Sequence, residues 1–188
     1  MNEDDITLLL DAVRRLVNEK LIPAEAQIDR QHRIPDELLD LMRQMGLFAY
    51  AIPAEHGGLG LNKWAEVRMI FEFCRAAPAY RSYVGTTNGV GGKSIVVDGT
   101  EAQKQRYLPA VAAGELIVSF CLTEPGSGSD AKSLSTTARR EGDRYVLNGS
   151  KRFISNAPIA GLFTVMARTD PDDKSAAGIS AFLVEAGT

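Results

Sequence analysis

The chain has 188 residues, of which 45% are hydrophobic and 24% are charged, and its formal net charge is −3. This composition is typical of a globular protein with a sizeable core, and the net negative charge argues against a basic surface that binds nucleic acid or anionic membranes. No apolar run approaches the ~20 residues that a membrane-spanning helix needs, so no membrane span is predicted.

The two cysteines, Cys74 and Cys121, each lie in an apolar segment. We expect two buried thiols rather than a disulfide, which is typical of a reducing compartment and favours a cytoplasmic protein. The acidic start of the chain lacks the pattern of a signal or transit peptide. His32 and His56 stand alone in polar segments, so no metal site is predicted.

The first half of the chain is predicted to be helical. Apolar residues recur at helical spacing between residues 6 and 21, and Pro23 should kink or end that helix because proline lacks the backbone N–H. A second helix is expected from near Pro35 to a stop before Gly46. Residues 52–61 form a glycine-rich segment with neither helical nor strand periodicity, which predicts a loop.

A third helix is expected from about residue 62 to residue 77. Residues 85–99 are harder to assign, because each of their glycines weakens a helix by roughly 1 kcal/mol relative to alanine. Thr100 and Gln103 match a capping box, and Pro109 should interrupt the helix that they start. One apolar stripe of the third helix should be buried in the core, and it comprises Trp64, Val67, Ile70, Phe71 and Cys74.

After Gly114 the sequence changes from helical periodicity to short apolar segments of strand length. Gly142 and Asp143 predict a hairpin turn, and Asn148 with Gly149 predicts a second one, because these residues accept positive φ. Strands are expected at residues 116–122, 136–140, 145–147, 151–155, 162–169 and 179–184.

The fold class that follows is α+β. An all-α N-terminal domain, residues 1–114, should precede an antiparallel, β-barrel-like domain that begins at residue 115 and is incomplete at residue 188. No internal repeat or low-complexity segment interrupts this division.

Residues 120–130, FCLTEPGSGSD, end an apolar strand with an abrupt turn. Pro125 pushes Glu124 out of the helical region, and Gly126 and Gly128 allow a ligand to approach the backbone closely. On its residues alone the segment is either an ordinary loop whose hydroxyls cap a turn or a site for a polar, anionic ligand. The hydroxyl groups in question belong to Thr123, Ser127 and Ser129.

Five motifs together resemble the acyl-CoA dehydrogenase family, and the resemblance covers essentially the whole chain. Each motif alone is of moderate specificity, but their order and spacing make the combination specific. In chain order they are IPAEHGGLG (residues 52–60), GTEAQKQRYLP (99–109), CLTEPGSGSD (121–130), YVLNGSKRFISN (145–156) and GISAFLVE (178–185).

The resemblance implies a helical N-terminal domain, a β-barrel-like middle domain that binds flavin, and a C-terminal helical bundle that is absent from this chain. It also implies FAD as a non-covalently bound cofactor, held by two stretches of the middle domain. The first stretch comprises Phe120, Cys121, Leu122, Thr123, Glu124, Pro125, Gly126, Ser127, Gly128 and Ser129, and the second comprises Phe153, Ile154 and Ser155.

The same resemblance implies roles for four of these residues. Thr123 should hydrogen-bond the pyrimidine side of the flavin, where a neutral donor stabilises the charge of the reduced ring. Ser129 should lie near the diphosphate and bind the acyl-CoA. The Phe153 ring should pack beside the flavin, and the Ser155 hydroxyl should face N5. Ser155 replaces the commoner threonine and lacks the methyl group that restrains its rotamer.

The implied activity is α,β-dehydrogenation of an acyl-CoA thioester to a trans-2-enoyl-CoA, with hydride transfer to flavin N5, as in fatty acid β-oxidation. The base is expected in the absent C-terminal domain, so no catalytic residue is predicted in this chain, which should be inactive alone. Glu124 is not expected to be the base. The implied partners are acyl-CoA, an electron-transfer flavoprotein and further copies of the chain in a homo-oligomer, a tetramer or a dimer.

Two alternatives to a dehydrogenase remain open. The same fold serves flavin oxidases and monooxygenases that use O₂, and these would reoxidise rapidly in air with release of peroxide. The second alternative is that the chain is a non-catalytic fragment or partner subunit, which would carry no flavin after purification.

Overall fold

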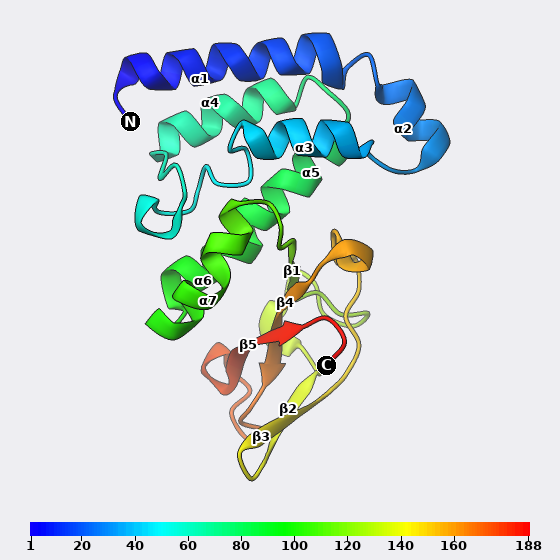
Figure 1. The fold of residues 1–188 in the computed structure, drawn as a ribbon. Helices are drawn as coiled ribbons and strands as arrows, with labels where there is room; N and C mark the ends of the chain where they lie inside the picture. Colours follow the sequence, from blue (N-terminus) through cyan, green and yellow to red (C-terminus); the bar gives the residue numbers. More distant parts are fainter. The chain divides into compact units, whose positions relative to one another are not determined.

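The computed structural model describes residues 1–188 (Figure 1). The chain divides into two compact units, Met1–Leu116, here the helical unit, and Ile117–Thr188, here the sheet unit. A helical unit followed by a unit with a five-stranded sheet confirms the predicted order of the fold. None of the helices combines the length and the apolar character that crossing a bilayer requires.

The helical unit contains seven α-helices. π-Helical turns extend α1 over Val17–Leu21 and join α5 to α6 over Thr87–Gly91. As predicted, α1 with its π-helical turn ends before Pro23, and the helix expected after Pro35, which is α3, ends before Gly46. Helix α2, between them, was not predicted. The helices are α1 (Glu3–Leu16), α2 (Glu25–Gln31), α3 (Asp36–Gln44), α4 (Lys63–Phe73), α5 (Pro78–Thr86), α6 (Gly92–Asp98) and α7 (Glu101–Ala112).

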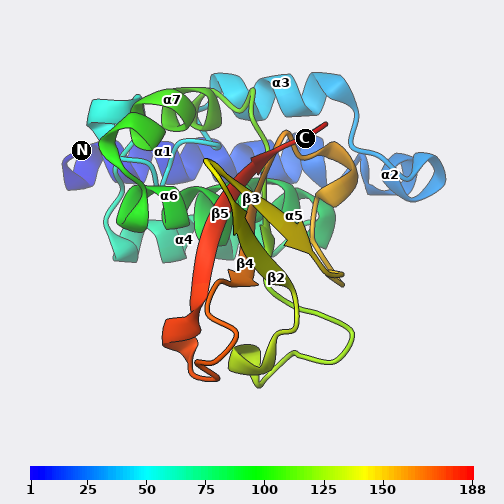
Figure 2. The ribbon, with the colours of Figure 1, turned by 90° about the horizontal axis from the view of Figure 1, so that it is seen from below.

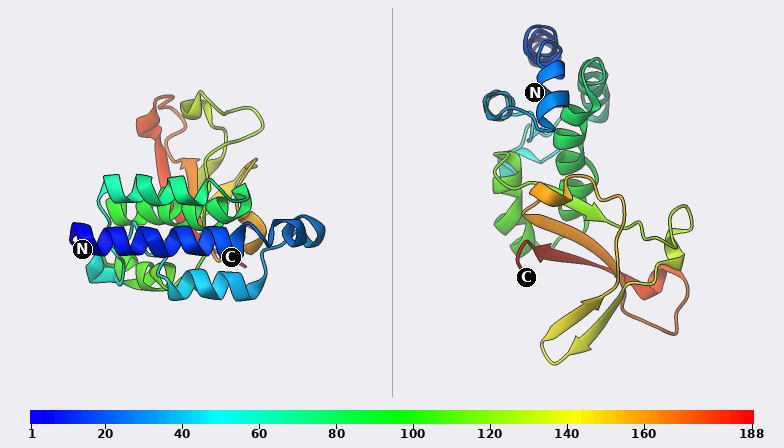
Figure 3. Two further views of the ribbon diagram at one scale, coloured as in Figure 1. Left: turned by 90° about the horizontal axis from the view of Figure 1, so that it is seen from above. Right: turned by 90° about the vertical axis from the view of Figure 1, so that its right-hand side faces the viewer.

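Helix α1 lies alongside α4 (Figures 1 and 3). The ion pairs between the two helices join Arg14 to Glu72 at 2.8 Å and Arg68 to Glu3 at 2.6 Å. Partly exposed pairs of this kind contribute about 0–1 kcal/mol each to stability, so their main effect is on the relative alignment of the two helices. The main stabilisation comes from the apolar stripe that α1 buries, which comprises Ile6, Leu10, Val13 and Leu16.

The apolar stripe that we expected α4 to bury faces outward instead. Trp64 and Phe71 are 65% and 67% exposed, Val67 and Cys74 are exposed as well, and only Ile70 is half-buried. Both faces of α4 carry apolar side chains at helical spacing, so periodicity alone could not identify the inner one. The residues that α4 does bury are Ala65, Glu66, Met69 and Phe73.

The glycine-rich segment after α5 is helical, against its intrinsic propensity. Buried Asn88 holds it in place, because its Nδ2 donates to the Leu47 carbonyl at 3.1 Å and its Oδ1 accepts from the Ala51 amide at 3.3 Å. A Cβ at Gly92 would lie 2.6 Å from the Thr87 carbonyl oxygen. Glycine therefore permits close packing at this point.

Helix α7 begins at the predicted capping box. The Gln103 amide donates to Thr100 Oγ1 at 3.3 Å, and the Thr100 amide donates to Gln103 Oε1 at 2.8 Å. The expected interruption at Pro109 was wrong, since the helix continues to Ala112. Leu108 and Val111 are fully buried on either side of the proline, and their burial offsets the backbone bond that proline cannot make.

The sheet of the second unit is mixed and is not closed into a barrel. Its central strand, β4, pairs antiparallel with β5 along its whole length and parallel with β1 over its first half. The expected purely antiparallel arrangement was wrong, because the long connection from β1 to β4 returns the chain to the same end of the sheet. The strands are β1 (Val118–Cys121), β2 (Thr137–Glu141), β3 (Arg144–Asn148), β4 (Leu162–Arg168) and β5 (Ile179–Glu185).

Strands β2 and β3 form the hairpin that Gly142 and Asp143 predict. Glu141 pairs directly with Arg144 across the two-residue turn, and Gly142 has a φ of 64°. Within the sheet unit one residue pair, Thr137 with Arg168, joins the hairpin to β4 by strand pairing, and the Tyr145 ring lies edge-on to Phe182 of β5 at 5.1 Å between centroids. The turn of the hairpin projects from the sheet (Figures 2 and 3).

The second predicted turn, at Asn148 and Gly149, and the strand predicted at residues 151–155 were both wrong. This stretch is irregular, and Phe153 has a φ of 57°. A Cβ at Gly149 would lie 2.3 Å from Thr136 Oγ1, so this glycine permits close packing rather than a hairpin turn.

The expectation of two buried thiols was wrong for Cys74, which is exposed directly after α4, and right for Cys121, which is buried at the end of β1. The two thiols should therefore differ in reactivity. Burial also raises the pKa of the Cys121 thiol, although the charge of Lys151 lowers it. A thiol reagent should therefore modify only Cys74 in the native protein and both cysteines after unfolding. Cys74→Ser should abolish the fast reaction and Cys121→Ser should leave it unchanged. Rapid modification of Cys121 would contradict the buried placement.

Candidate functional site

The candidate site forms where β1 ends, because two stretches distant in the sequence meet there. The Arg152 amide donates to the Thr123 carbonyl at 2.8 Å, and Ser119 Oγ donates to the Ser155 carbonyl at 2.7 Å. The structure therefore brings residues 120–129 next to residues 153–155.

A tight turn follows β1. Its ends are joined by two backbone bonds, from the Glu124 amide to the Ser127 carbonyl at 2.8 Å and from the Ser127 amide to the Glu124 carbonyl at 3.2 Å. Ser127 Oγ donates to the Asp130 carbonyl at 2.8 Å, so this hydroxyl stabilises the turn. A Cβ at Gly126 or Gly128 would meet nothing within 4 Å, so their backbone lies open to an approaching molecule.

The predicted site residues differ widely in exposure. Phe120, Leu122, Thr123 and Ile154 are half-buried, and Cys121, Glu124 and Ser127 are buried. The exposed members are Pro125, Gly126, Gly128, Ser129, Phe153 and Ser155.

Glu124 is a buried carboxylate whose two oxygens are both occupied, and its side chain is 2% exposed. Oε1 accepts from Lys151 Nζ and from the Thr136 amide, each at 2.9 Å. Oε2 accepts from the amide and the hydroxyl of Ser135, at 2.6 and 2.7 Å. Burial by itself raises the pKa of Glu124, but the hydrogen bonds from Thr136, Ser135 and Lys151 outweigh it and hold the pKa well below its usual range. A carboxylate held ionised in this way is a poor proton acceptor near neutral pH.

Lys151 is the partner that the sequence reasoning missed. Its side chain is 12% exposed, and Nζ donates to the Leu122 carbonyl at 3.1 Å as well as to Glu124. The available signal was indirect: a glutamate placed directly after a buried strand needs a cation or several donors to compensate its desolvation.

Phe153 is an aromatic residue in an unusual backbone conformation. Its φ of 57° lies in the left-handed region, which costs a bulky residue about 1–2 kcal/mol. The ring is 79% exposed, and the Arg152 guanidinium lies over it at 4.5 Å from the centroid. An exposed flat ring held by a strained backbone is typical of a functional position and suits a planar ligand.

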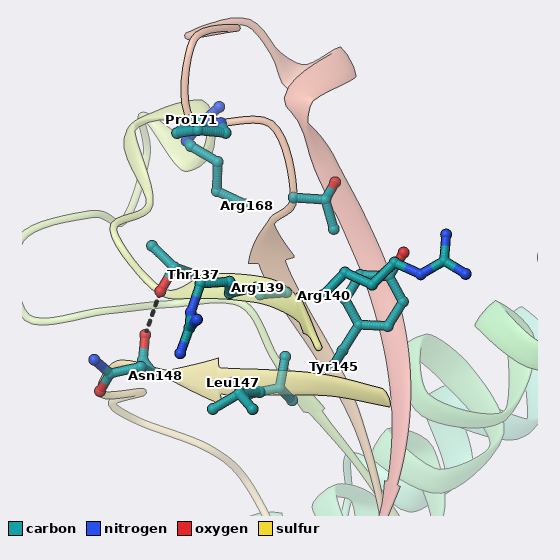
Figure 4. Close-up of a pocket in the computed structure, with 11 residues that line it drawn as sticks. Thr137, Arg139, Arg140, Tyr145, Leu147, Asn148, Arg168 and Pro171 are labelled. Atoms are coloured by element: carbon teal, nitrogen blue, oxygen red, sulfur yellow. Dashed lines mark hydrogen bonds between the residues drawn. The ribbon is translucent and has the colours of Figure 1, made fainter. Parts of the chain in front are cut away.

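A hollow of about 630 Å³ lies between the β2–β3 hairpin and the end of β4 (Figure 4). A second hollow of about 490 Å³ adjoins it, since Thr137, Arg168 and Pro171 line both. These hollows were not predicted, because their basic residues are scattered along the chain. The cations that line them are Lys132, Arg139, Arg140, Arg168 and Lys174.

Solved structures with the same fold cover the whole chain. A chain from the electron transferring flavoprotein of Acidaminococcus fermentans is 34% identical with a TM-score of 0.90. A glutaryl-CoA dehydrogenase of Mycobacterium smegmatis in complex with FADH2 is 31% identical (TM-score 0.88), and the prolyl acyl carrier protein oxidase AnaB is 28% identical (0.89). The alignments cover 49%, 47% and 50% of those chains, respectively.

Curated proteins with similar sequences are enzymes of related kinds. The 3-(aryl)acrylate reductase of Clostridium sporogenes is 38% identical over 95% of the chain, and cyclohex-1-ene-1-carbonyl-CoA dehydrogenase of Syntrophus aciditrophicus is 38% identical over 100%. The chain covers 47% and 46% of these proteins, about half of their length. Residues 3–115 match the N-terminal domain of acyl-CoA dehydrogenases and residues 119–188 match the middle domain. The chain therefore belongs to the acyl-CoA dehydrogenase family.

Proposed function

We propose that this chain forms the flavin-binding and part of the substrate-binding region of an FAD-dependent acyl-CoA dehydrogenase. The observation that carries the proposal is the placement of Phe153, an exposed and strained aromatic residue beside the turn that follows β1. The family is FAD-dependent, and the solved glutaryl-CoA dehydrogenase that this chain resembles contains FADH2.

The residues at the end of β1 fit a flavin ring. The Phe153 ring offers a flat apolar surface, and the hydroxyls of Thr123 and Ser155 have no hydrogen-bond partner within the chain. The adjacent Glu124 and Lys151 carry opposite charges, so together they add no net charge beside the ring. Thr123 and Ser155 would therefore act as neutral donors, with Phe153 as the packing surface.

Bound FAD would supply hydride acceptance for the α,β-dehydrogenation of an acyl-CoA to a trans-2-enoyl-CoA, a reaction that also needs a carboxylate base for the α-proton. This chain contributes binding and orientation. Because Glu124 is ionised, buried and fully hydrogen-bonded, we assign the base to a residue outside this chain.

The basic hollows support a CoA thioester as the substrate. Lys132 and Lys174 line the smaller hollow, and Arg168 keeps a buried positive charge between the two. Phosphate groups of CoA would be attracted by this surface. Ser129, our candidate substrate-binding residue, precedes Lys132 by three positions and is exposed.

The electron acceptor proposed here is an electron-transfer flavoprotein, because a relative that is 38% identical over 85% of this chain, CarC of Acetobacterium woodii, is named as a subunit of a caffeyl-CoA reductase–Etf complex. The family resemblance supports two further parts of the proposal, fatty acid β-oxidation as the metabolic role and a homo-oligomer as the assembly. The proposed cytoplasmic location rests instead on the two free cysteines, which are typical of a reducing compartment. The resemblance also supports an inactive isolated chain, since the base lies outside it.

A second candidate function is favoured by two of the relatives. AnaB is an oxidase and the Clostridium sporogenes protein is a reductase, so the same scaffold serves other electron acceptors and the reverse direction of reaction. Rapid reoxidation in air with release of peroxide would select an oxidase. Preferential reduction of an enoyl substrate would select a reductase.

The protein, prepared as its gene encodes it, should carry a flavin whose visible absorbance bleaches anaerobically when an acyl-CoA is added. Phe153→Ala should weaken FAD binding by roughly ten- to a hundredfold, because an aromatic stacking contact contributes about 1–3 kcal/mol. Phe153→Tyr keeps the ring and should bind FAD like the parent protein. A flavin-loaded protein that no thioester bleaches would contradict the dehydrogenase assignment.

Replacing both Lys132 and Lys174 with alanine should weaken the binding of CoA, and the difference should shrink as the salt concentration rises. Exposed charges contribute up to about 1 kcal/mol each, which corresponds to a factor of roughly five per lysine. Arg144→Ala is the matched control, because Arg144 is an exposed cation of the same unit that lines neither hollow. Equal loss of affinity in this control would argue for a general charge effect. Isothermal titration calorimetry with CoA measures the affinity of the parent protein, the double lysine variant and Arg144→Ala.

A further inference from the structure

The stretch that carries Phe153 has no strand pairing to hold it. Between Gly149 and Asn156 the chain is irregular, so a few individual hydrogen bonds fix its position. At one end Lys151 and Arg152 bind the turn after β1, and at the other end the Ser155 carbonyl accepts from Ser119. The position of the Phe153 ring therefore depends on these polar contacts.

Glu124 joins three segments at one point. Its own segment is the turn after β1, its Oε2 is held by Ser135 just before β2, and its Oε1 is held by Lys151 from the irregular stretch. The Thr136 amide completes the set of donors. Because both oxygens are occupied, the carboxylate has a single favourable orientation, and so does the lysine that reaches it.

Lys151 in turn bridges two points of the opposite segment. Its Nζ contacts the Leu122 carbonyl at 3.1 Å and Glu124 Oε1 at 2.9 Å, while the neighbouring Arg152 amide contacts the Thr123 carbonyl at 2.8 Å. These three bonds run side by side from residues 151 and 152 to residues 122–124. They leave Phe153, the next residue, at a fixed distance from Thr123.

We propose that the Glu124–Lys151 pair is a clamp that positions Phe153 and Thr123 on the two sides of the flavin site. The inference rests on the proposed function, because it assigns the clamp's purpose to FAD binding. Glu124 and Lys151 are positioning residues, since Glu124 is buried, Lys151 is largely buried, and both act through their neighbours. The clamp should set the affinity for FAD and the environment of the bound ring.

The direct test is to replace Glu124 with glutamine, which keeps the shape of the side chain and removes its charge. E124Q leaves the buried Lys151 without a counter-charge, so the irregular stretch should shift. We expect FAD to bind at least tenfold more weakly to the apoprotein of E124Q. At saturating FAD, the visible circular dichroism of the bound flavin should differ from that of the parent protein.

Three variants separate positioning from general stability. Leu162→Ala creates a cavity in β4 and lowers stability without touching the clamp, so at saturating FAD its flavin spectrum should match the parent. E141Q removes an exposed carboxylate of the same unit and should change neither affinity nor spectrum. Glu124→Asp keeps the charge opposite Lys151, so it should fold even where E124Q does not, and it should weaken FAD binding by a smaller factor than E124Q.

A double-mutant cycle tests whether the two residues act as one unit. K151M should weaken FAD binding about as much as E124Q, and the double variant should lose much less than the product of the two factors, because no unpaired charge remains. Purely multiplicative losses would contradict the clamp.

A parent protein that binds FAD, with E124Q and E124D equal to it in affinity and spectrum, overturns the clamp alone. A parent protein that takes up no FAD overturns the proposed function as well.

The clamp should also make the stability of the protein depend on pH. The hydrogen bonds of Glu124 hold its pKa below the ordinary value of 4.5, so the stabilisation is present above that pH and is lost as the pH falls toward the folded-state value. Lys151 is the charged group in contact with Glu124, and the buried Cys121 thiol is the other titratable group that feels this lysine. The thermal unfolding midpoint should fall between about pH 5 and pH 3, with a smaller slope in E124Q than in E141Q. Equal slopes would contradict the ionised clamp.

Discussion

The buried carboxylate of Glu124 is the constraint on which the candidate site depends. An ionised carboxylate removed from water is strongly destabilising unless hydrogen bonds and a counter-charge surround it. Here the donors come from Ser135, Thr136 and Lys151, which lie on two other segments of the sheet unit. The need to satisfy one side chain therefore fixes the relative positions of three stretches that share no strand pairing at this point.

The features that the sequence predicted well are those whose cause lies within a few residues. The capping box of Thr100 and Gln103 and the turn at Gly142 and Asp143 are of this kind. Each signal and its partner are two or three positions apart, so no knowledge of the tertiary structure was needed. The order of a helical unit and a sheet unit follows in the same way, from periodicity that each segment carries by itself.

The features that were mispredicted depend on residues distant in the sequence. Helix α4 has apolar side chains on two faces, and only its neighbours decide that Met69 rather than Trp64 is buried. Pro109 remains inside α7 because the core packs around it. The flavin role of the stretch after β1 came from the family resemblance, since hydroxyl and glycine residues alone are equally typical of an ordinary loop.

The predicted strand at residues 151–155 fails for a reason that explains the site. In a strand, residues 151, 153 and 155 would share one face of the sheet, because side chains alternate. Lys151 must be buried to reach Glu124, so a regular strand would bury the Phe153 ring as well. The left-handed φ of Phe153 breaks the alternation directly after the clamp and turns the ring outward. The strain at Phe153 is thus the structural consequence of placing a largely buried cation and an exposed aromatic ring two residues apart, an arrangement that suits the flavin site that we propose beside β1.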